Sequence, residues 1–144
     1  MYPVLTYGTL RPGCSNYVFL EGRSTPMGEV TLDGYKMFAG INYPYVVEGD
    51  GEIVATLNKI APEHYVEAMH DLDFLEGFKG TGSRQNHYER ILVDVFFDGE
   101  MIKAWMYVAM DERVVARVVN DLYYMPGGDW MEFLEILRGL TPVE

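Results

Sequence analysis

The chain has 144 residues, 49% of them hydrophobic, and this composition predicts a single folded domain over residues 1–144 with a sizeable core. The formal net charge is −11, from 22 acidic and 11 basic residues, so repulsion between like charges argues against nucleic acid and anionic membranes as partners. The lone cysteine, Cys14, has no internal disulfide partner, and no leader-like or membrane-spanning apolar run is visible, so a cytoplasmic protein is expected.

The N-terminal part of the sequence predicts short strands. Residues 3–7 are rich in strand formers and stop at Gly8, after which residues 8–15 are expected to form a loop. Further strand-like runs follow at residues 29–32, 35–38, 45–47 and 52–57. The dipeptides Asp33-Gly34 and Asp50-Gly51 lie between these runs and predict turns.

Helical spacing begins after Pro62, which suits the first position of a helix. Apolar residues then recur at three- and four-residue intervals on one face, at Tyr65, Met69, Leu72 and Leu75. Gly77 directly follows this pattern and predicts the end of the helix.

Residues 90–109 predict a hairpin, because two strand-forming runs flank Asp98-Gly99. Two helices are expected to close the chain, with Asp111 and Asp129 as their N-caps. Mostly antiparallel strands with an inserted helix and helices at the end predict an α+β fold.

The loop after the first strand is the first candidate site. A strand that ends at Gly8 frees the next amides from ladder pairing, and consecutive free amides can form a nest that binds an anion or stabilises an oxyanion. The residues concerned are Tyr7, Gly8, Thr9 and Leu10. From these features alone, an ordinary strand-to-loop turn is the favoured interpretation.

Glu76 is the second candidate, as a general acid or base. At the last turn of the predicted helix, the negative end of the helix dipole and the nearby Asp73 would both raise its pKa toward neutrality. The alternative is a solvent-exposed acidic helix end, and the sequence does not distinguish the two.

The remaining reactive residues do not form a recognisable site. His64, His70 and His87 lack the spacing of metal ligands on a helix, so no metal is expected. No sequence feature ties a histidine to Cys14, which predicts an inert thiol rather than a nucleophile.

Five short motifs occur in order along the chain, and together they resemble the gamma-glutamylcyclotransferase-like family, especially its gamma-glutamylamine cyclotransferase branch. They are Tyr7-Gly8-Thr9-Leu10 with Arg11-Pro12-Gly13, Tyr43-Pro44-Tyr45-Val46-Val47, Leu72-Asp73-Phe74-Leu75-Glu76-Gly77-Phe78, Tyr88-Glu89-Arg90 and Gly128-Asp129-Trp130.

The resemblance implies a small, mostly antiparallel β-barrel with helices packed around it. It also implies a cofactor-independent conversion of a γ-glutamyl amine or amino acid to 5-oxoproline and a free amine. Glu76 would be the acid/base, and Tyr7 to Leu10 would hold the substrate. Tyr88 and Tyr107 match family tyrosines near the pocket.

Two departures concern the identity of the substrate. Ala55 stands where the family usually has Gly, and the polar segment 79–87 could reshape one wall of the pocket. One alternative function is therefore cleavage of a γ-glutamyl protecting group from a larger metabolite. A second is a non-catalytic ligand-binding or protein-interaction module that keeps the same pocket. The sequence does not indicate an oligomeric state.

Overall fold

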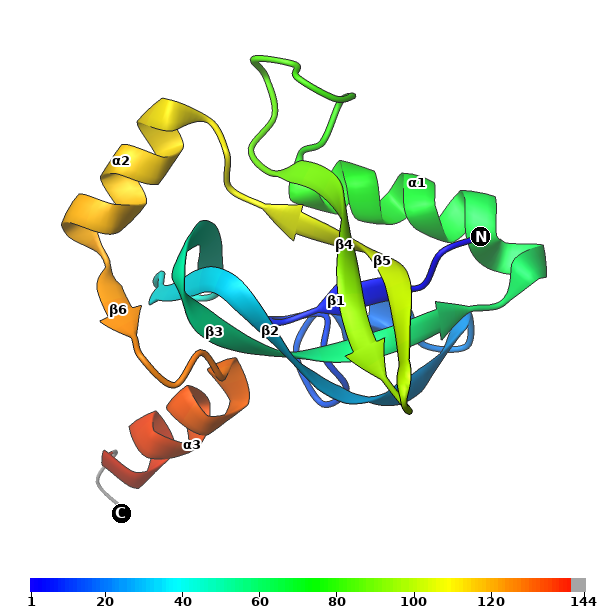
Figure 1. The fold of residues 1–144 in the computed structure, drawn as a ribbon, viewed down its shortest axis with the longest axis horizontal. Coiled ribbons are helices and arrows are strands. Elements are labelled where there is room, and N and C mark those ends of the chain that lie inside the picture. The colour runs from blue at the N-terminus through cyan, green and yellow to red at the C-terminus, as the bar shows by residue number, and fades with distance from the viewer. Residues whose placement is uncertain (141–144) are drawn as a thin grey trace.

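The computed structural model describes residues 1–140 as one six-stranded sheet with three α-helices (Figure 1). The strands are β1 (Val4–Thr6), β2 (Ser24–Ala39), β3 (Pro44–Ile60), β4 (Glu89–Phe97), β5 (Glu100–Val108) and β6 (Tyr123–Met125). The α-helices are α1 (Tyr65–Glu76), α2 (Glu112–Asp121) and α3 (Trp130–Leu140), and short 3-10 turns occupy Tyr17–Phe19 and Pro62–His64. The predicted α+β class is confirmed.

The sheet has the order β4-β5-β1-β3-β2-β6, and its pairings are antiparallel except for the parallel contact of β1 with β5. It curls strongly: the ring of Phe97, at the end of β4, lies against Gly28 of β2 although three strands separate them in the sheet order. The result is a mostly antiparallel half-barrel, in agreement with the expected barrel-like architecture.

The hairpin of β2 and β3 corrects one prediction. Neither Asp33-Gly34 nor Asp50-Gly51 forms a turn, because both strands continue through them and the register shifts between Asp33 and Tyr35. The positive φ of 91° at Gly34 fits a β-bulge inside the strand. An Asp-Gly pair suits such a bulge as readily as it suits a turn. The actual reversal lies at residues 40–43, closed by the Gly40 amide donating to the Tyr43 carbonyl at 3.0 Å.

The other local predictions are confirmed. A 3-10 turn that starts at Pro62 leads into helix α1. The helix ends at Gly77, whose φ of 66° gives the left-handed cap. Positive φ angles at Asp98 and Gly99 form the tight turn of the β4–β5 hairpin. Asp111 caps α2, and the Asp129 carboxylate accepts from the first amides of α3. Strand β6 was not predicted, because three residues are too few to show the alternation of polar and apolar side chains that marks a strand.

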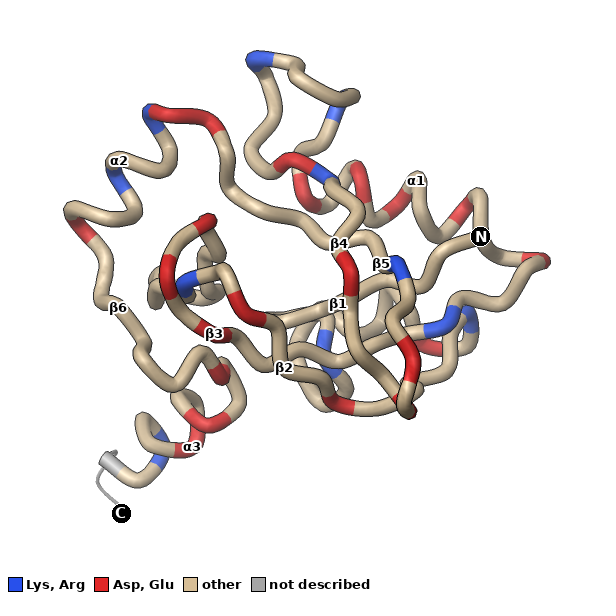
Figure 2. Tube along the Cα trace, in the orientation of Figure 1, with Lys and Arg blue, Asp and Glu red and all other residues tan. Residues whose placement is uncertain are grey.

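The core has two layers because alternate residues of β1 face opposite sides of the sheet. Leu5 packs inside the half-barrel with Leu57 of β3, whereas Val4 belongs to the layer beneath α1 with Leu72. Acidic residues are spread over helices, strands and loops (Figure 2). No helix within residues 1–140 is both long and apolar enough to cross a membrane.

Candidate active site

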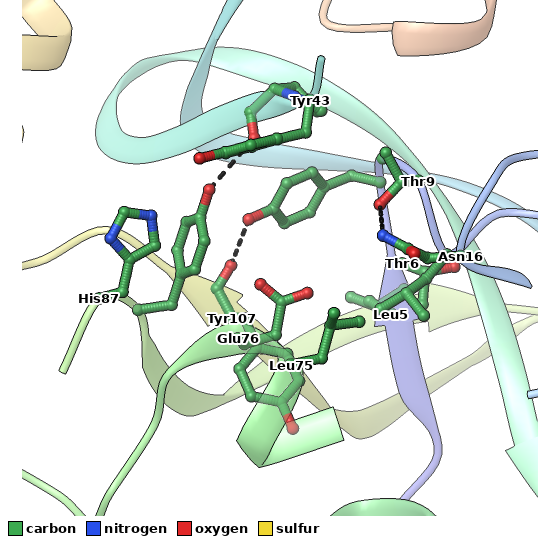
Figure 3. Close-up of a pocket in the computed structure, with 14 residues that line it drawn as sticks. Leu5, Thr6, Thr9, Asn16, Tyr43, Leu75, Glu76, His87 and Tyr107 are labelled. Atoms are coloured by element: carbon green, nitrogen blue, oxygen red, sulfur yellow. Dashed lines mark hydrogen bonds between the residues drawn. The ribbon is translucent and has the colours of Figure 1, made fainter. Parts of the chain in front are cut away.

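A pocket of about 210 Å³ opens where the chain leaves β1, beside the C-terminal end of α1 (Figure 3). All seven residues that the sequence predicted for the site line it, namely Tyr7, Gly8, Thr9, Leu10, Glu76, Tyr88 and Tyr107. The other lining residues were not predicted individually as site residues; they are Leu5, Thr6, Asn16, Tyr43, Pro44, Leu75 and His87. Ala55 is not among the lining residues and lies fully buried in the inner core layer, so this departure from the family does not narrow the pocket.

One wall is the cradle loop, defined as Gly8, Thr9 and Leu10. The Arg11 amide donates to the Gly8 carbonyl at 3.0 Å, which closes a four-residue turn with Thr9 and Leu10 at its centre. Within residues 1–140, the amides of the three cradle residues have no hydrogen-bond acceptor. Asn16 steadies the loop by donating from its amide to the Thr9 carbonyl and from Nδ2 to Thr9 Oγ1, both at 2.8 Å. The main chain is thus fixed while its donors stay available.

Glu76 is the last residue of α1, and its carboxyl points into the pocket (Figure 3). Among residues 1–140 it has no hydrogen-bond or ion-pair partner. Burial raises its pKa from an ordinary 4.5 to about 7. The direction of this shift was predicted, but the expected contribution of Asp73 was not correct. Asp73 accepts from the Tyr107 hydroxyl at 2.6 Å and pairs with Arg90 at 3.1 Å.

Tyr7, Tyr88 and Tyr107 each use the hydroxyl proton in a hydrogen bond within the protein. Tyr7 donates to the Tyr107 carbonyl at 2.5 Å, and Tyr88 donates to the Pro44 carbonyl at 3.3 Å. Burial raises the pKa of each phenol, so all three stay protonated at neutral pH. With their protons engaged, Tyr7 and Tyr88 can offer only oxygen lone pairs, whereas the Tyr107 hydroxyl is held by Asp73.

The segment 78–87 returns the chain to the end of α1. The His87 amide donates to the Gly77 carbonyl at 3.0 Å, which places His87 in the pocket lining. Asn86 orders the segment by accepting from the Lys79 amide at 2.6 Å and donating to Glu89 at 2.9 Å. Burial lowers the pKa of His87, which favours the neutral ring. The expected influence of segment 79–87 on a pocket wall is therefore exerted by His87.

The raised pKa of Glu76 makes a prediction about stability. The unfolded chain loses this proton at lower pH than the folded chain, so the free energy of unfolding falls as pH rises from about 4.5 to 7. We expect Glu76→Gln to stabilise the fold by as much as about 3 kcal/mol at pH 8, and by much less at pH 5. Thermal unfolding at the two pH values checks this. A stabilisation that does not grow with pH would contradict the assigned shift.

Cys14 and a cluster of metal-ligating side chains would be the other candidates for a reactive centre. Cys14 is half-buried, and burial raises the pKa of its thiol, which makes it a poorer nucleophile. Within residues 1–140, no three His, Cys, Asp or Glu side chains come together as a potential metal site.

Residues 4–132 match the family model described as gamma-glutamyl cyclotransferase, AIG2-like, and the chain belongs to this family. Its fold is similar to that of protein PH0828 from Pyrococcus horikoshii, with a TM-score of 0.66 at 20% identity over 96% of this chain and 98% of that one. YkqA from Bacillus subtilis gives a TM-score of 0.68 at 22% identity, over 99% of this chain and 44% of YkqA. For ytfP from Escherichia coli the TM-score is 0.59 at 25% identity, over 91% and 97% of the two chains. No curated protein matches the chain.

Proposed function

We propose that this protein is a γ-glutamylcyclotransferase that converts a γ-glutamyl amine or γ-glutamyl amino acid to 5-oxoproline and a free amine. The observation that carries the proposal is one unpaired carboxyl, Glu76, with a pKa of about 7 in the same pocket as the free amides of the cradle loop. Membership of the gamma-glutamyl cyclotransferase family supports the same reaction.

The reaction is an intramolecular aminolysis. Glu76 takes a proton from the α-ammonium group of the substrate, and the resulting amine attacks the γ-carbonyl carbon. The new carbon–nitrogen bond closes a five-membered ring and leaves a tetrahedral oxyanion. As the oxyanion collapses, the bond to the leaving amine breaks, and Glu76 returns its proton to that amine. The ring nitrogen still carries two hydrogens after the attack, and it passes the extra proton through Glu76 to the released amine, which departs as an ammonium ion. The Glu76 carboxylate is regenerated, and the reaction as written uses no cofactor.

The pocket provides separate places for the two charged ends of the substrate. Glu76 and the hydroxyl lone pairs of Tyr7 and Tyr88 can accept hydrogen bonds and suit an ammonium group. The cradle amides donate and suit an anion, either the α-carboxylate or the developing oxyanion. A substrate held between these two walls is folded toward ring closure, which lowers the entropic part of the barrier.

The rate should depend on the ionisation of Glu76. Because only the carboxylate can accept a proton, kcat/KM is expected to fall about tenfold per pH unit below pH 7 and to level off above it. This fall is the acid limb of the pH profile, and it is measured by following 5-oxoproline release across pH. A limb near pH 4.5, the ordinary value for glutamate, would show that the carboxyl is not buried during catalysis.

The decisive test is release of 5-oxoproline from a panel of substrates. Within the family we propose the γ-glutamylamine cyclotransferase activity, so γ-glutamyl-lysine is expected to be turned over faster than glutathione. Faster cleavage of a bulkier γ-glutamyl conjugate would instead indicate removal of a protecting group. Binding of these compounds without any release of 5-oxoproline would refute the enzymatic proposal and identify a binding module.

A further inference from the structure

A buried arginine directly follows the cradle loop, and the reaction scheme gives it no role. Arg11 is 4% exposed, although it carries a full charge in the interior. Its Nη1 donates to Asp129 Oδ1 at 2.9 Å, its Nη2 to Glu29 Oε2 at 3.0 Å and its Nε to Thr56 Oγ1 at 3.2 Å. Asp129 directly precedes α3, Glu29 lies in β2 and Thr56 lies in β3. The Arg11 side chain therefore connects three elements.

Asp129 is the partner that matters most. Its side chain is 20% exposed, whereas that of Glu29 is 64% exposed and its ion pair is therefore weakened by water. The same Asp129 oxygen also accepts from the Met131 amide at 3.1 Å and from the Glu132 amide at 3.5 Å. Arg11 and the beginning of α3 are thus held by a single carboxylate oxygen.

Asp129 is itself fixed by the residue before it. The Gly128 carbonyl accepts from the Val54 amide at 2.8 Å, so this segment is hydrogen-bonded to β3. The backbones approach so closely that a Cβ added at Gly128 would lie 2.0 Å from the Glu52 carbonyl oxygen. The Gly128-Asp129-Trp130 motif therefore places a carboxylate at a set position relative to the sheet.

We propose that Arg11 and Asp129 are positioning residues that hold the cradle loop in its anion-binding conformation, an inference that rests on the proposed function. Arg11 is the last residue of the turn whose centre is Thr9 and Leu10, and its amide closes that turn. Fixing the Arg11 side chain fixes the direction of the free amides without touching the substrate. A misplacement of about 1 Å in such a group costs roughly 100-fold in rate.

The test is Asp129→Asn, because Asn still caps a helix but removes the charge that holds Arg11. We expect kcat/KM for the best γ-glutamyl substrate to fall about 10- to 100-fold, at a temperature where circular dichroism shows a fully folded protein. The acid limb of the pH profile should stay near pH 7, because Glu76 is untouched. A loosened pocket would move that limb toward 4.5. Asp129→Ser serves in its place if the Asn variant does not fold.

Asp111→Asn is the matched control. Asp111 caps α2 and pairs with Arg113, whose side chain is 83% exposed, so kcat/KM should change less than twofold. Combining Asp129→Asn with Arg11→Lys should lower kcat/KM no further than the larger single loss, since both changes disrupt the same Arg11–Asp129 ion pair.

Three results would overturn the positioning role: a folded Asp129→Asn protein with wild-type kcat/KM, an acid limb in that variant that moves toward pH 4.5, or losses that multiply in the double variant. If the wild-type protein releases no 5-oxoproline, the enzymatic proposal fails before any variant is compared, and the positioning role fails with it.

Discussion

Replacing Glu76 by Gln is expected to lower 5-oxoproline release about 10²- to 10⁴-fold while the protein stays folded. An amide has nearly the shape of the carboxyl but cannot take the proton from the substrate ammonium or return it to the leaving amine. The carboxyl has no partner among residues 1–140, so the substitution breaks no hydrogen bond or ion pair there. Turnover and circular dichroism of the same preparation check both parts of this prediction.

Glu67→Gln provides the control on the same helix. Glu67 lies in the first turn of α1, its side chain is exposed, and it is not part of the pocket lining. The control should therefore retain wild-type turnover. Wild-type turnover in folded Glu76→Gln protein would rule out the acid/base role.

Features that depend on neighbouring residues were predicted well. The end of α1 at Gly77, the Asp98-Gly99 turn and the two aspartate caps each follow from a local conformational preference. Because the position of Glu76 depends on the end of α1, its place at a helix terminus could be predicted too. The same local rules failed at Asp33-Gly34, where pairing with a long partner strand favoured a bulge over a turn.

Features that depend on the assembled fold were not accessible from the sequence. The pKa of Glu76 is raised by burial, which arises only when β1, β5 and the segment before Tyr88 close around it. His87 reaches the pocket through a backbone bond to Gly77, a contact without any pattern in the sequence. The Arg11–Asp129 ion pair likewise joins residues 118 positions apart. The candidate residues could be found from motifs, but their partners and ionisation could not.

Gly8→Ala is expected to lower kcat/KM about 10²- to 10³-fold, the usual cost of losing an oxyanion donor. A Cβ added at Gly8 would lie 2.8 Å from Pro44 Cδ and 2.9 Å from Pro44 Cγ. The proline ring cannot rotate away, so the cradle loop or the start of β3 must move. A shift of Pro44 would also disturb its carbonyl, which holds the Tyr88 hydroxyl. Steady-state kinetics and a thermal unfolding curve of the variant measure the effect.

The division of this loss between kcat and KM identifies the anion that the cradle amides bind. Donors that act on the oxyanion are used only in the transition state, so their displacement lowers kcat and leaves KM unchanged. Donors that hold the α-carboxylate act already in the bound substrate, so their displacement raises KM. Gly139→Ala is the control, since a Cβ there meets no atom within 4 Å and Ala favours the helix. Equal, near-wild-type kinetics for both variants would remove the cradle loop from the mechanism and leave Glu76 without an anion-binding partner.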